Sequence, residues 1–292
     1  MARTKKIRFL TALGTLAAAG AMLVSGMTPV SAASTATPAA HKSYDKTINY
    51  INLGDSYSAG FGSGSLAPAT IPGCLRGTGP THVSKIDALK NVKLSFDASC
   101  AGATTKDIAE IVAAITPQLA TADLVTLTLG ANDLDTRGLV MACSTLGTDK
   151  ACNQALLAGI LAIPAVGTSA KKTLRALDAA TPGKILVLGY PRLFSTTNGN
   201  QPLITAKRAK QLNALDDMLN LAILGATART NTRFVPVTGA FLGHGLGSES
   251  PWIYFNTLEL TDPFNLHPTT DGYLDGYYPA VKRQLKYLHI IR

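Results

Sequence analysis

Short segments rich in β-branched and aliphatic residues recur along the chain, and each predicts a buried β-strand. They lie at residues 47–53, 92–96, 124–129, 185–188 and 233–237. Stretches of helical character lie between and after them, at 83–89, 105–119, 156–180, 205–227 and 271–288. The run Leu124-Val-Thr-Leu-Thr-Leu129 is almost continuously apolar, as expected of a strand buried on both faces of a parallel sheet. The alternation predicts a three-layer α/β/α sandwich with a central, mostly parallel, five-stranded sheet.

The first 46 residues stand apart from this pattern. Basic residues precede a mostly apolar run at 9–24, and small residues follow at Val30-Ser31-Ala32, which together are typical of a secretory signal peptide over residues 1–32. A transmembrane anchor is the alternative, but the apolar run is shorter than the roughly 20 residues that span a bilayer. Residues 33–46, rich in Ala, Ser, Thr and Pro, predict a flexible leader, and residues 47–292 predict a single domain.

Composition and charge narrow the class of protein. The chain has 292 residues, of which 46% are hydrophobic and 15% charged, so a globular core is expected and general disorder is not. Its formal net charge is +9, and removal of the signal peptide with Arg3, Lys5, Lys6 and Arg8 leaves +5. The remaining basic residues are spread along the chain and form no run with interleaved aromatic residues. This distribution argues against nucleic acid as a partner.

The cysteines predict disulfides, because they are even in number and the chain is expected to be exported. They are Cys74, Cys100, Cys143 and Cys152, which allow three pairings. We predict that sequence neighbours pair, Cys74 with Cys100 and Cys143 with Cys152, which closes two modest loops. Zinc is the alternative, but no Cys-x-x-Cys spacing and no nearby histidine pair supports it, so no metal is expected.

The first predicted strand runs into Gly54-Asp55-Ser56. This position places a serine hydroxyl just beyond the carboxyl end of a strand, where parallel sheets present functional groups, so Ser56 is a candidate nucleophile. In isolation, Asp55 and Ser56 are typical of a turn or a helix cap. A phosphate-binding loop is disfavoured, because the glycines of Gly60-Phe-Gly62-Ser-Gly64 lack the last glycine of the dinucleotide fingerprint. The Gly-x-Ser-x-Gly elbow of α/β-hydrolases does not occur in the sequence.

Three further blocks follow in order along the chain. They are Ser99-Cys-Ala-Gly102 after the second predicted strand, Gly130-Ala-Asn132-Asp133 after the third, and Asn265-Leu-His267-Pro268 before the last helix. Together with Gly54-Asp55-Ser56 they resemble the four motif blocks of the SGNH, or GDSL, hydrolase superfamily of lipases and esterases. The resemblance extends from residue 54 to residue 268 and implies the flavodoxin-like α/β/α fold of that superfamily.

The resemblance also implies a role for a residue in each block. Ser56 is the expected nucleophile, and His267 is the expected general base that takes its proton. The backbone N–H groups of Ser56 and Gly102 and the side-chain amide of Asn132 are the expected donors of an oxyanion hole.

The chain departs from the family pattern at the group that orients the histidine. The family usually has an aspartate three residues before the histidine, where this chain has Phe264. Two candidates remain, the side chain of Asp262 and a backbone carbonyl in Phe264-Asn265. Pro263 stiffens the segment through which Asp262 would have to reach back. Because some members of the superfamily use a carbonyl here, we predict that of Asn265.

We therefore predict a secreted serine ester hydrolase that cleaves carboxylic esters of lipids through an acyl-enzyme, without metal or cofactor. A carbohydrate (acetyl) esterase or a phospholipase is the alternative within the family, and a non-catalytic secreted binding protein is a less favoured one. The expected partner is a lipid or another small ester, and we expect a monomer without stable membrane insertion. His82 and His244 lie outside the blocks and are expected to be capping, solvated or loop residues.

Overall fold

Five parallel strands form the central sheet of the protein, which a computed structural model describes over residues 46–292. They are β1 (Ile48–Gly54), β4 (Val92–Ser99), β5 (Leu124–Thr128), β6 (Lys184–Leu188) and β7 (Thr232–Val235). Each coincides with a predicted strand, and every adjacent pair is parallel, which confirms the predicted fold class. The predicted signal peptide (1–32) and nearly all of the predicted leader (33–46) lie outside the described residues.

The order of the strands, β4-β1-β5-β6-β7, places a switch point beside β1. The chain builds β4 on one side of β1 and then crosses to β5 on its other side. In sheets of this kind the connections diverge at such a point and leave a crevice beyond the carboxyl ends of the strands. Gly54, the last residue of β1, pairs with both Ser99 and Thr128, so the residues after Gly54 emerge at this crevice.

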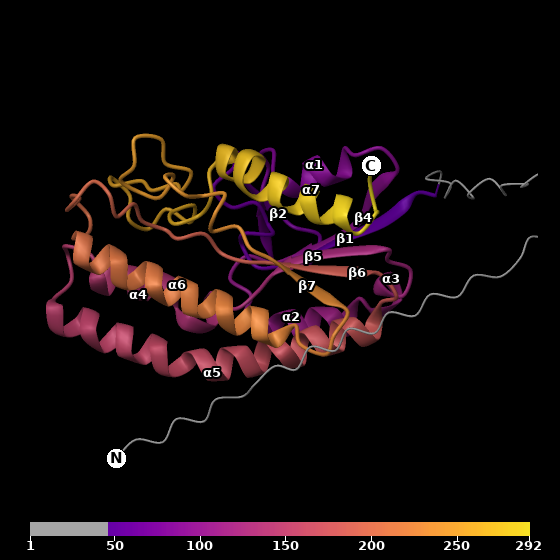
Figure 1. Cartoon of the computed structure of the whole chain (residues 1–292), viewed down its shortest axis with the longest axis horizontal. Helices are drawn as coiled ribbons and strands as arrows, with labels where there is room; N and C mark the ends of the chain where they lie inside the picture. The colour runs from indigo at the N-terminus through magenta and orange to yellow at the C-terminus, as the bar shows by residue number, and fades with distance from the viewer. Residues whose placement is uncertain (1–45) are drawn as a thin grey trace, which may run out of the picture. The chain divides into compact units, whose positions relative to one another are not determined.

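Helices cover both faces of the sheet, as Figure 1 shows. On one face lie α1 (His82–Asp87) and α7 (Tyr278–Tyr287), which continues a π-helical turn, η2 (Gly272–Tyr277). On the other face lie α2 (Thr105–Ala114), α4 (Thr136–Cys143), α5 (Asp149–Ala180) and α6 (Ala206–Ala226). The short α3 (Thr116–Leu119) leads into β5. The arrangement is the predicted three-layer sandwich.

Threonine side chains fix where the longer helices begin. The hydroxyl of Thr104 accepts the backbone N–H of Asp107 at 3.3 Å, and the Asp107 carboxylate accepts the backbone N–H of Thr104 at 2.9 Å. Thr148 and Thr205 cap α5 and α6 through their hydroxyl oxygens. These bonds satisfy backbone N–H groups that have no partner inside a helix, and so they define the first turn of each helix.

A small hairpin and the helix α4 (Thr136–Cys143) are absent from the sequence prediction. A small antiparallel hairpin of β2 (Leu66–Pro68) and β3 (Leu75–Gly77) has mostly exposed or half-exposed side chains, so no alternating apolar pattern marks it. The helix α4 follows a left-handed residue, Asp135 at φ +48°, whose carboxylate caps it by accepting the N–H of Gly138 at 3.1 Å. Asp and Gly at these positions are more typical of a turn than of a helix start.

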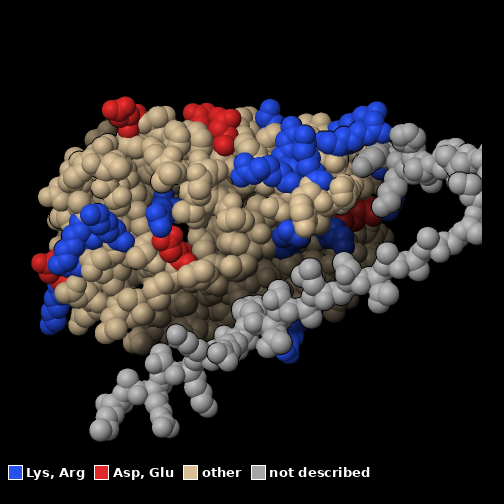
Figure 2. Space-filling model, in the orientation of Figure 1, with Lys and Arg blue, Asp and Glu red and all other residues tan. Residues whose placement is uncertain are grey.

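The longest helix, α5, begins at Asp149 rather than at residue 156 and packs against α2, α4 and α6. By length and composition alone it is apolar enough to cross a membrane, a test that core helices of soluble proteins also pass. On the face of the molecule shown in Figure 2, Lys and Arg side chains lie in several separate groups with Asp and Glu between them.

Candidate active site

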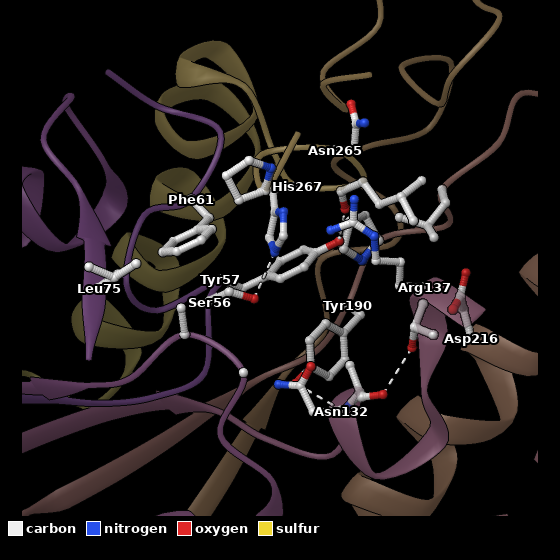
Figure 3. A pocket seen from close by; sticks show the side chains of 18 of the residues that line it. Ser56, Tyr57, Phe61, Leu75, Asn132, Arg137, Tyr190, Asp216, Asn265 and His267 are labelled. Atoms are coloured by element: carbon white, nitrogen blue, oxygen red, sulfur yellow. Dashed lines mark hydrogen bonds between the residues drawn. The ribbon is translucent and has the colours of Figure 1, made fainter. Parts of the chain in front are cut away.

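The turn that follows β1 presents Ser56. Gly54 has φ +113°, and a Cβ atom there would lie 2.5 Å from the backbone oxygen of Thr128. Only glycine therefore allows the end of β1 to lie this close to β5. Ser56 is 8% exposed, and its hydroxyl faces the pocket shown in Figure 3.

The carboxylate of Asp55 fixes the turn that carries Ser56 through three hydrogen bonds. It accepts the backbone N–H of Tyr57 at 3.0 Å, the hydroxyl of Thr128 at 2.6 Å and a short hydrogen bond from the hydroxyl of Tyr190. Burial raises the pKa of Asp55, and these hydrogen bonds oppose the rise. Asp55 therefore joins the Ser56 turn to β5 and to the segment after β6, which is more than the local turn role that the sequence indicates.

His267 lies directly against Ser56. Its Nε2 is 2.7 Å from the Oγ of Ser56, although 211 positions separate the two residues. The imidazole lies beside the rings of Tyr57 and Phe61, with centroid distances of 5.3 and 5.4 Å. Tyr57 is fixed in turn, because its hydroxyl donates to the carbonyl of Leu266 at 2.6 Å. The structure thus brings together the serine and the histidine that the motif blocks single out.

The imidazole of His267 is neutral at physiological pH. Burial lowers the pKa of His267 to about 4, and backbone hydrogen bonds with Phe264 and Asn265 oppose the decrease. Because Nδ1 faces a carbonyl oxygen, which can only accept, we assign the ring proton to Nδ1. The electron pair on Nε2 then faces the hydroxyl of Ser56 and can accept its proton.

The carbonyl that accepts the Nδ1 proton belongs to Phe264. Its oxygen lies 3.2 Å from Nδ1 and also accepts the backbone N–H of His267 at 3.2 Å. We predict the carbonyl of Asn265 for this bond, and the structure has the carbonyl of the preceding residue, Phe264, at that position. A backbone hydrogen bond with Asn265 also raises the pKa of His267. The shift arises because Leu266 adopts φ +69°, which folds the chain back so that the carbonyl three residues before His267 faces the ring.

The carboxylate of Asp262, the other predicted candidate, binds elsewhere. It accepts the backbone N–H of Phe264 at 2.8 Å and the hydroxyl of Tyr254 at 3.0 Å. Its charge still raises the pKa of His267 slightly, as the last of several contributions. Asp262 therefore fixes the loop that carries the histidine, as a turn residue does.

Gly102 and Asn132 reach the same pocket from the ends of β4 and β5. Gly102 has φ +84°, and nothing lies within 4 Å of the position where a Cβ atom would be, so its backbone borders open space. The amide nitrogen of Asn132 donates one hydrogen to the carbonyl of Ala103 at 3.0 Å. This bond fixes the amide and leaves its second hydrogen for a ligand. Ser56, Gly102 and Asn132, the residues predicted to supply the oxyanion donors, thus line one pocket.

The pocket beside Ser56 and His267 has a volume of about 370 Å³, which suits a small organic ligand. Much of its wall is apolar or aromatic, with Phe61, Leu75, Tyr190, Pro191, Leu193, Leu219, Pro263 and Leu266. An arginine and an aspartate that the motif blocks do not contain also line it, Arg137 and Asp216. Arg137 lies in α4 and Asp216 in α6, and no pattern in the sequence marks either of them as part of a site.

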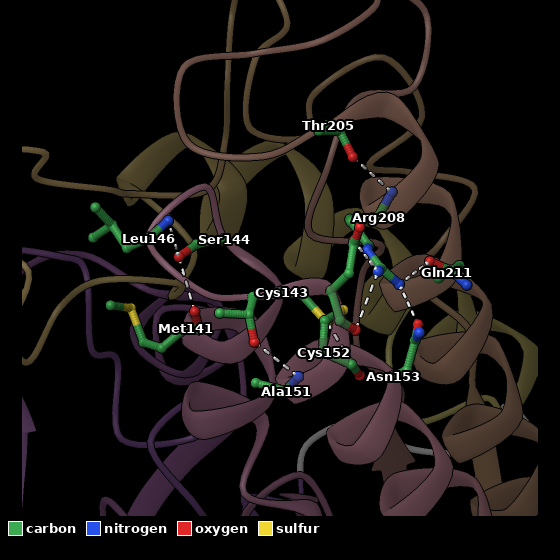
Figure 4. Close-up of a disulfide and its surroundings, with 12 residues drawn as sticks. Met141, Cys143, Ser144, Leu146, Ala151, Cys152, Asn153, Thr205, Arg208 and Gln211 are labelled. Atoms are coloured by element: carbon green, nitrogen blue, oxygen red, sulfur yellow. Dashed lines mark hydrogen bonds and ion pairs between the residues drawn. A yellow bond between two sulfur atoms is a disulfide. The ribbon is translucent and has the colours of Figure 1, made fainter.

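Both disulfides have the predicted pairing. Cys74–Cys100 ties the loop between β2 and β3 to the residue after β4, two positions before Gly102. Cys143–Cys152 joins the end of α4 to the first turns of α5 (Figure 4). Beside the second bridge, the buried guanidinium of Arg208 donates to side chains at the start of α5. The first bridge therefore supports the wall of the pocket, and the second supports the helical layer.

His82 and His244, which lie outside the motif blocks, both stack on aromatic rings. His82 is fully buried against the rings of Tyr273 and Tyr277, contrary to the prediction of a capping or solvated residue. Neither of its ring nitrogens has a hydrogen-bond partner in the described part of the chain, and burial lowers its pKa to about 3. His244 stacks on Trp252 in a loop. Within residues 46–292, no group of three or more His, Cys, Asp or Glu side chains is arranged to hold a metal ion.

Comparisons with known proteins agree with this geometry. A sequence profile of the GDSL-like lipase/acylhydrolase family matches residues 53–274. The chain is 28% identical to a lipase of Streptomyces rimosus over 256 residues, which are 87% of this chain and 93% of that protein. It is 29% identical to Lipase 1 of Streptomyces coelicolor over 284 residues, which are 96% of this chain and 98% of that protein.

Solved structures share the fold. The crystal structure of an extracellular lipase from Streptomyces rimosus matches with a TM-score of 0.72 at 28% identity, covering 81% of this chain and 99% of that chain. A phospholipase A1 from Streptomyces albidoflavus matches with a TM-score of 0.70 at 24% identity and the same coverage. The fold and the paired serine and histidine thus define an esterase-like α/β protein. The chain belongs to the GDSL-like lipase/acylhydrolase family, and it is a carboxylic ester hydrolase.

Proposed function

We propose that the protein is a secreted serine hydrolase that cleaves carboxylic esters of lipids, with Ser56 as nucleophile and His267 as general base. The observation that carries the proposal is the 2.7 Å contact between Ser56 Oγ and His267 Nε2 in a largely apolar pocket. A neutral imidazole at this distance activates a serine hydroxyl, and an apolar wall receives a hydrocarbon chain.

In the first half of the reaction, Ser56 Oγ attacks the carbonyl carbon of the ester while its proton passes to Nε2 of His267. The negative charge on the former carbonyl oxygen is stabilised by the backbone N–H groups of Ser56 and Gly102 and by the amide of Asn132. The intermediate then collapses. The alcohol leaves with the proton from His267, and the acyl group stays on Ser56.

In the second half, a water molecule attacks the acyl-enzyme and gives its proton to Nε2 of His267. The same donors hold the second oxyanion. When this intermediate collapses, Ser56 takes back its proton and the carboxylic acid is released. Throughout, the carbonyl of Phe264 keeps the imidazole in position and stabilises its charged form with a dipole.

Several observations support lipid esters and export. The relatives in the comparisons carry the name lipase, and the wall of the pocket has the apolar side chains that an acyl chain needs. Two disulfides, the signal-peptide pattern and the likeness to an extracellular lipase all support secretion.

A hydrolysis profile tests the substrate class. The purified protein is offered short-chain and long-chain esters of one alcohol, a phospholipid and an acetylated sugar. We expect the acyl lipids to be cleaved with the highest kcat/KM, and preference for the acetylated sugar over every acyl lipid would overturn this part of the proposal. Labelling with an organophosphate and peptide mapping tests the nucleophile separately, because the label should be found on Ser56.

A further inference from the structure

Tyr190 is a buried residue of the pocket wall that lies outside the motif blocks. It follows β6, and its ring stands edge-on to Tyr57 at a centroid distance of 5.2 Å (Figure 3). Its backbone is fixed by Asn220 of α6, whose side-chain amide accepts the N–H of Tyr190 and donates to its carbonyl, each at 2.8 Å. Tyr190 is therefore anchored in the sheet and helix layers rather than in the loops around Ser56.

The hydroxyl group of Tyr190 bridges two of the motif blocks. It donates a hydrogen bond to Oδ2 of Asp55, the residue before Ser56. It also accepts the backbone N–H of Ala131, the residue before Asn132, at 3.4 Å. The hydroxyl proton points to Asp55 in this arrangement, and a lone pair of the oxygen is left for Ala131. One oxygen atom thus joins the turn that carries Ser56 to the segment that carries Asn132.

The hydroxyl keeps its proton in this bridge. Burial of Tyr190 and the negative charge of Asp55 both raise the pKa of the tyrosine hydroxyl well above its ordinary value. The bond to Asp55 is therefore present at neutral pH, and the group cannot act as a base there.

Among the described residues, no other hydrogen bond directly joins the Ser56 turn to the segment that carries Asn132. The remaining bonds between these parts of the chain end at Thr128, in β5. Gly130 then has φ +112°, so Asn132 lies beyond a bend that the strand does not fix. The bridge through Tyr190 spans this bend.

The position of Asn132 relative to Ser56 matters for the chemistry. The oxygen that becomes negative belongs to the ester carbonyl that Ser56 attacks, so its place is set by Ser56. An oxyanion donor is effective only at hydrogen-bond distance from that oxygen, and a misplacement of about 1 Å can cost about 10²-fold in rate. A contact that fixes the amide of Asn132 therefore acts on the transition state and has little effect on binding of the ester.

We propose that Tyr190 is a positioning residue, whose hydroxyl group holds the side-chain amide of Asn132 at the distance from Ser56 that the oxyanion requires. The inference rests on the proposed function, because it takes Ser56 as the nucleophile and Asn132 as an oxyanion donor. The hydroxyl is occupied by Asp55 and Ala131, so it acts through these neighbours rather than on the ester.

Tyr190→Phe tests the bridge, because it keeps the ring and removes only the oxygen. We expect kcat on one soluble ester to decrease by at least about tenfold with little change in KM, and by no more than the 10² to 10³-fold, roughly, that loss of a whole oxyanion donor costs. Tyr50→Phe is the matched control. Tyr50 is also fully buried, and its hydroxyl bonds to Thr126 at 2.6 Å in the sheet, away from the pocket. This variant should leave kcat unchanged.

A double-mutant cycle separates positioning from general support of the fold. Asn132→Ala has no amide to position, so adding Tyr190→Phe to it should decrease kcat by less than about twofold. A tyrosine that only supports the fold would decrease kcat by the same factor in both backgrounds. Hydrogen exchange of the wild-type protein, followed by NMR, needs no variant, and the N–H of Ala131 should be protected.

Three results would overturn the proposal. The first is a folded Tyr190→Phe protein with wild-type kcat, and the second is an equal decrease of kcat in both backgrounds of the cycle. The third is an N–H of Ala131 that exchanges as fast as those of exposed loops. Failure of the proposed function has a different signature, because Ser56→Ala and Asn132→Ala would then turn over like the wild type.

Discussion

The carbonyl oxygen of Phe264 accepts two hydrogen bonds from His267, one from its backbone N–H and one from Nδ1, each at 3.2 Å. The ring is thus oriented by the turn in which it lies rather than by a carboxylate. A carbonyl dipole stabilises the imidazolium less than a full negative charge does. Burial therefore has the largest effect on the pKa of His267 and lowers it to about 4. The ring stays neutral, and able to accept a proton, at any pH above that value.

The first prediction follows for Asp262. Asp262→Asn should keep most of kcat, because the carboxylate binds Tyr254 and the backbone of Phe264 rather than the imidazole. Loss of a triad carboxylate costs about 10⁴-fold in kcat in a serine hydrolase. Steady-state kinetics on one soluble ester decides between the two. A decrease of that size with an unchanged circular dichroism spectrum would make Asp262 the orienting group.

The second prediction concerns the oxyanion hole. Asn132→Ala removes one donor, so kcat should decrease by about 10² to 10³-fold with little change in KM. Ser56→Ala provides the background rate, because it removes the nucleophile and leaves the fold intact. An Asn132→Ala protein that turns over at the wild-type rate would exclude this amide from the hole.

The third prediction separates the two disulfides. The first closes a loop of 26 residues and the second a loop of 9, which in the chain-entropy model stabilise the fold by about 3.5 and about 2.5 kcal/mol. Replacing Cys74 and Cys100 by Ala should lower both the free energy of unfolding and kcat, because Cys100 lies two residues before Gly102. Replacing Cys143 and Cys152 by Ala is the matched control and should lower stability alone. Equal losses of kcat in the two variants would contradict the different roles.

The sequence predicts the sheet well, and the motif residues that it singles out line one pocket, for physical reasons. Buried parallel strands need continuous apolar runs, which are visible in the sequence. Functional groups of such sheets lie beyond the carboxyl ends of the strands, and the motif residues stand just after predicted strands or before a helix, at Ser56, Gly102, Asn132 and His267. What the sequence leaves undetermined depends on contacts between distant segments. In Asp216-Asp217, nothing local indicates which carboxylate meets Arg192 and which meets the pocket. The choice between Phe264 and Asn265 depends on the left-handed conformation of Leu266, which its side chain does not indicate.

His82 shows the same dependence on tertiary contacts. A histidine at the start of a short helix is typical of a surface position. In the structure, α1 packs against η2 and α7, and the ring of His82 lies beside Tyr273 and Tyr277. The hydroxyls of these tyrosines donate elsewhere, to the carbonyls of Phe61 and Gly189, so neither of them stabilises a charged imidazole.

The last prediction concerns stability in acid. The unfolded chain protonates His82 near its ordinary pKa of 6.5, whereas the buried ring stays neutral down to about 3. The unfolded state therefore binds more protons in this window, and stability falls as the pH falls from 6.5 towards 3, by about 1.4 kcal/mol per pH unit. His82→Phe preserves an aromatic ring and should reduce the slope of unfolding free energy against pH by that amount. His267 adds a slope of its own down to about 4, which the variant leaves in place. Urea unfolding between pH 5.5 and 4.5 measures the difference, with the exposed His289→Phe as control. The same slope in His82→Phe as in the wild type would show that His82 is protonated in the folded protein.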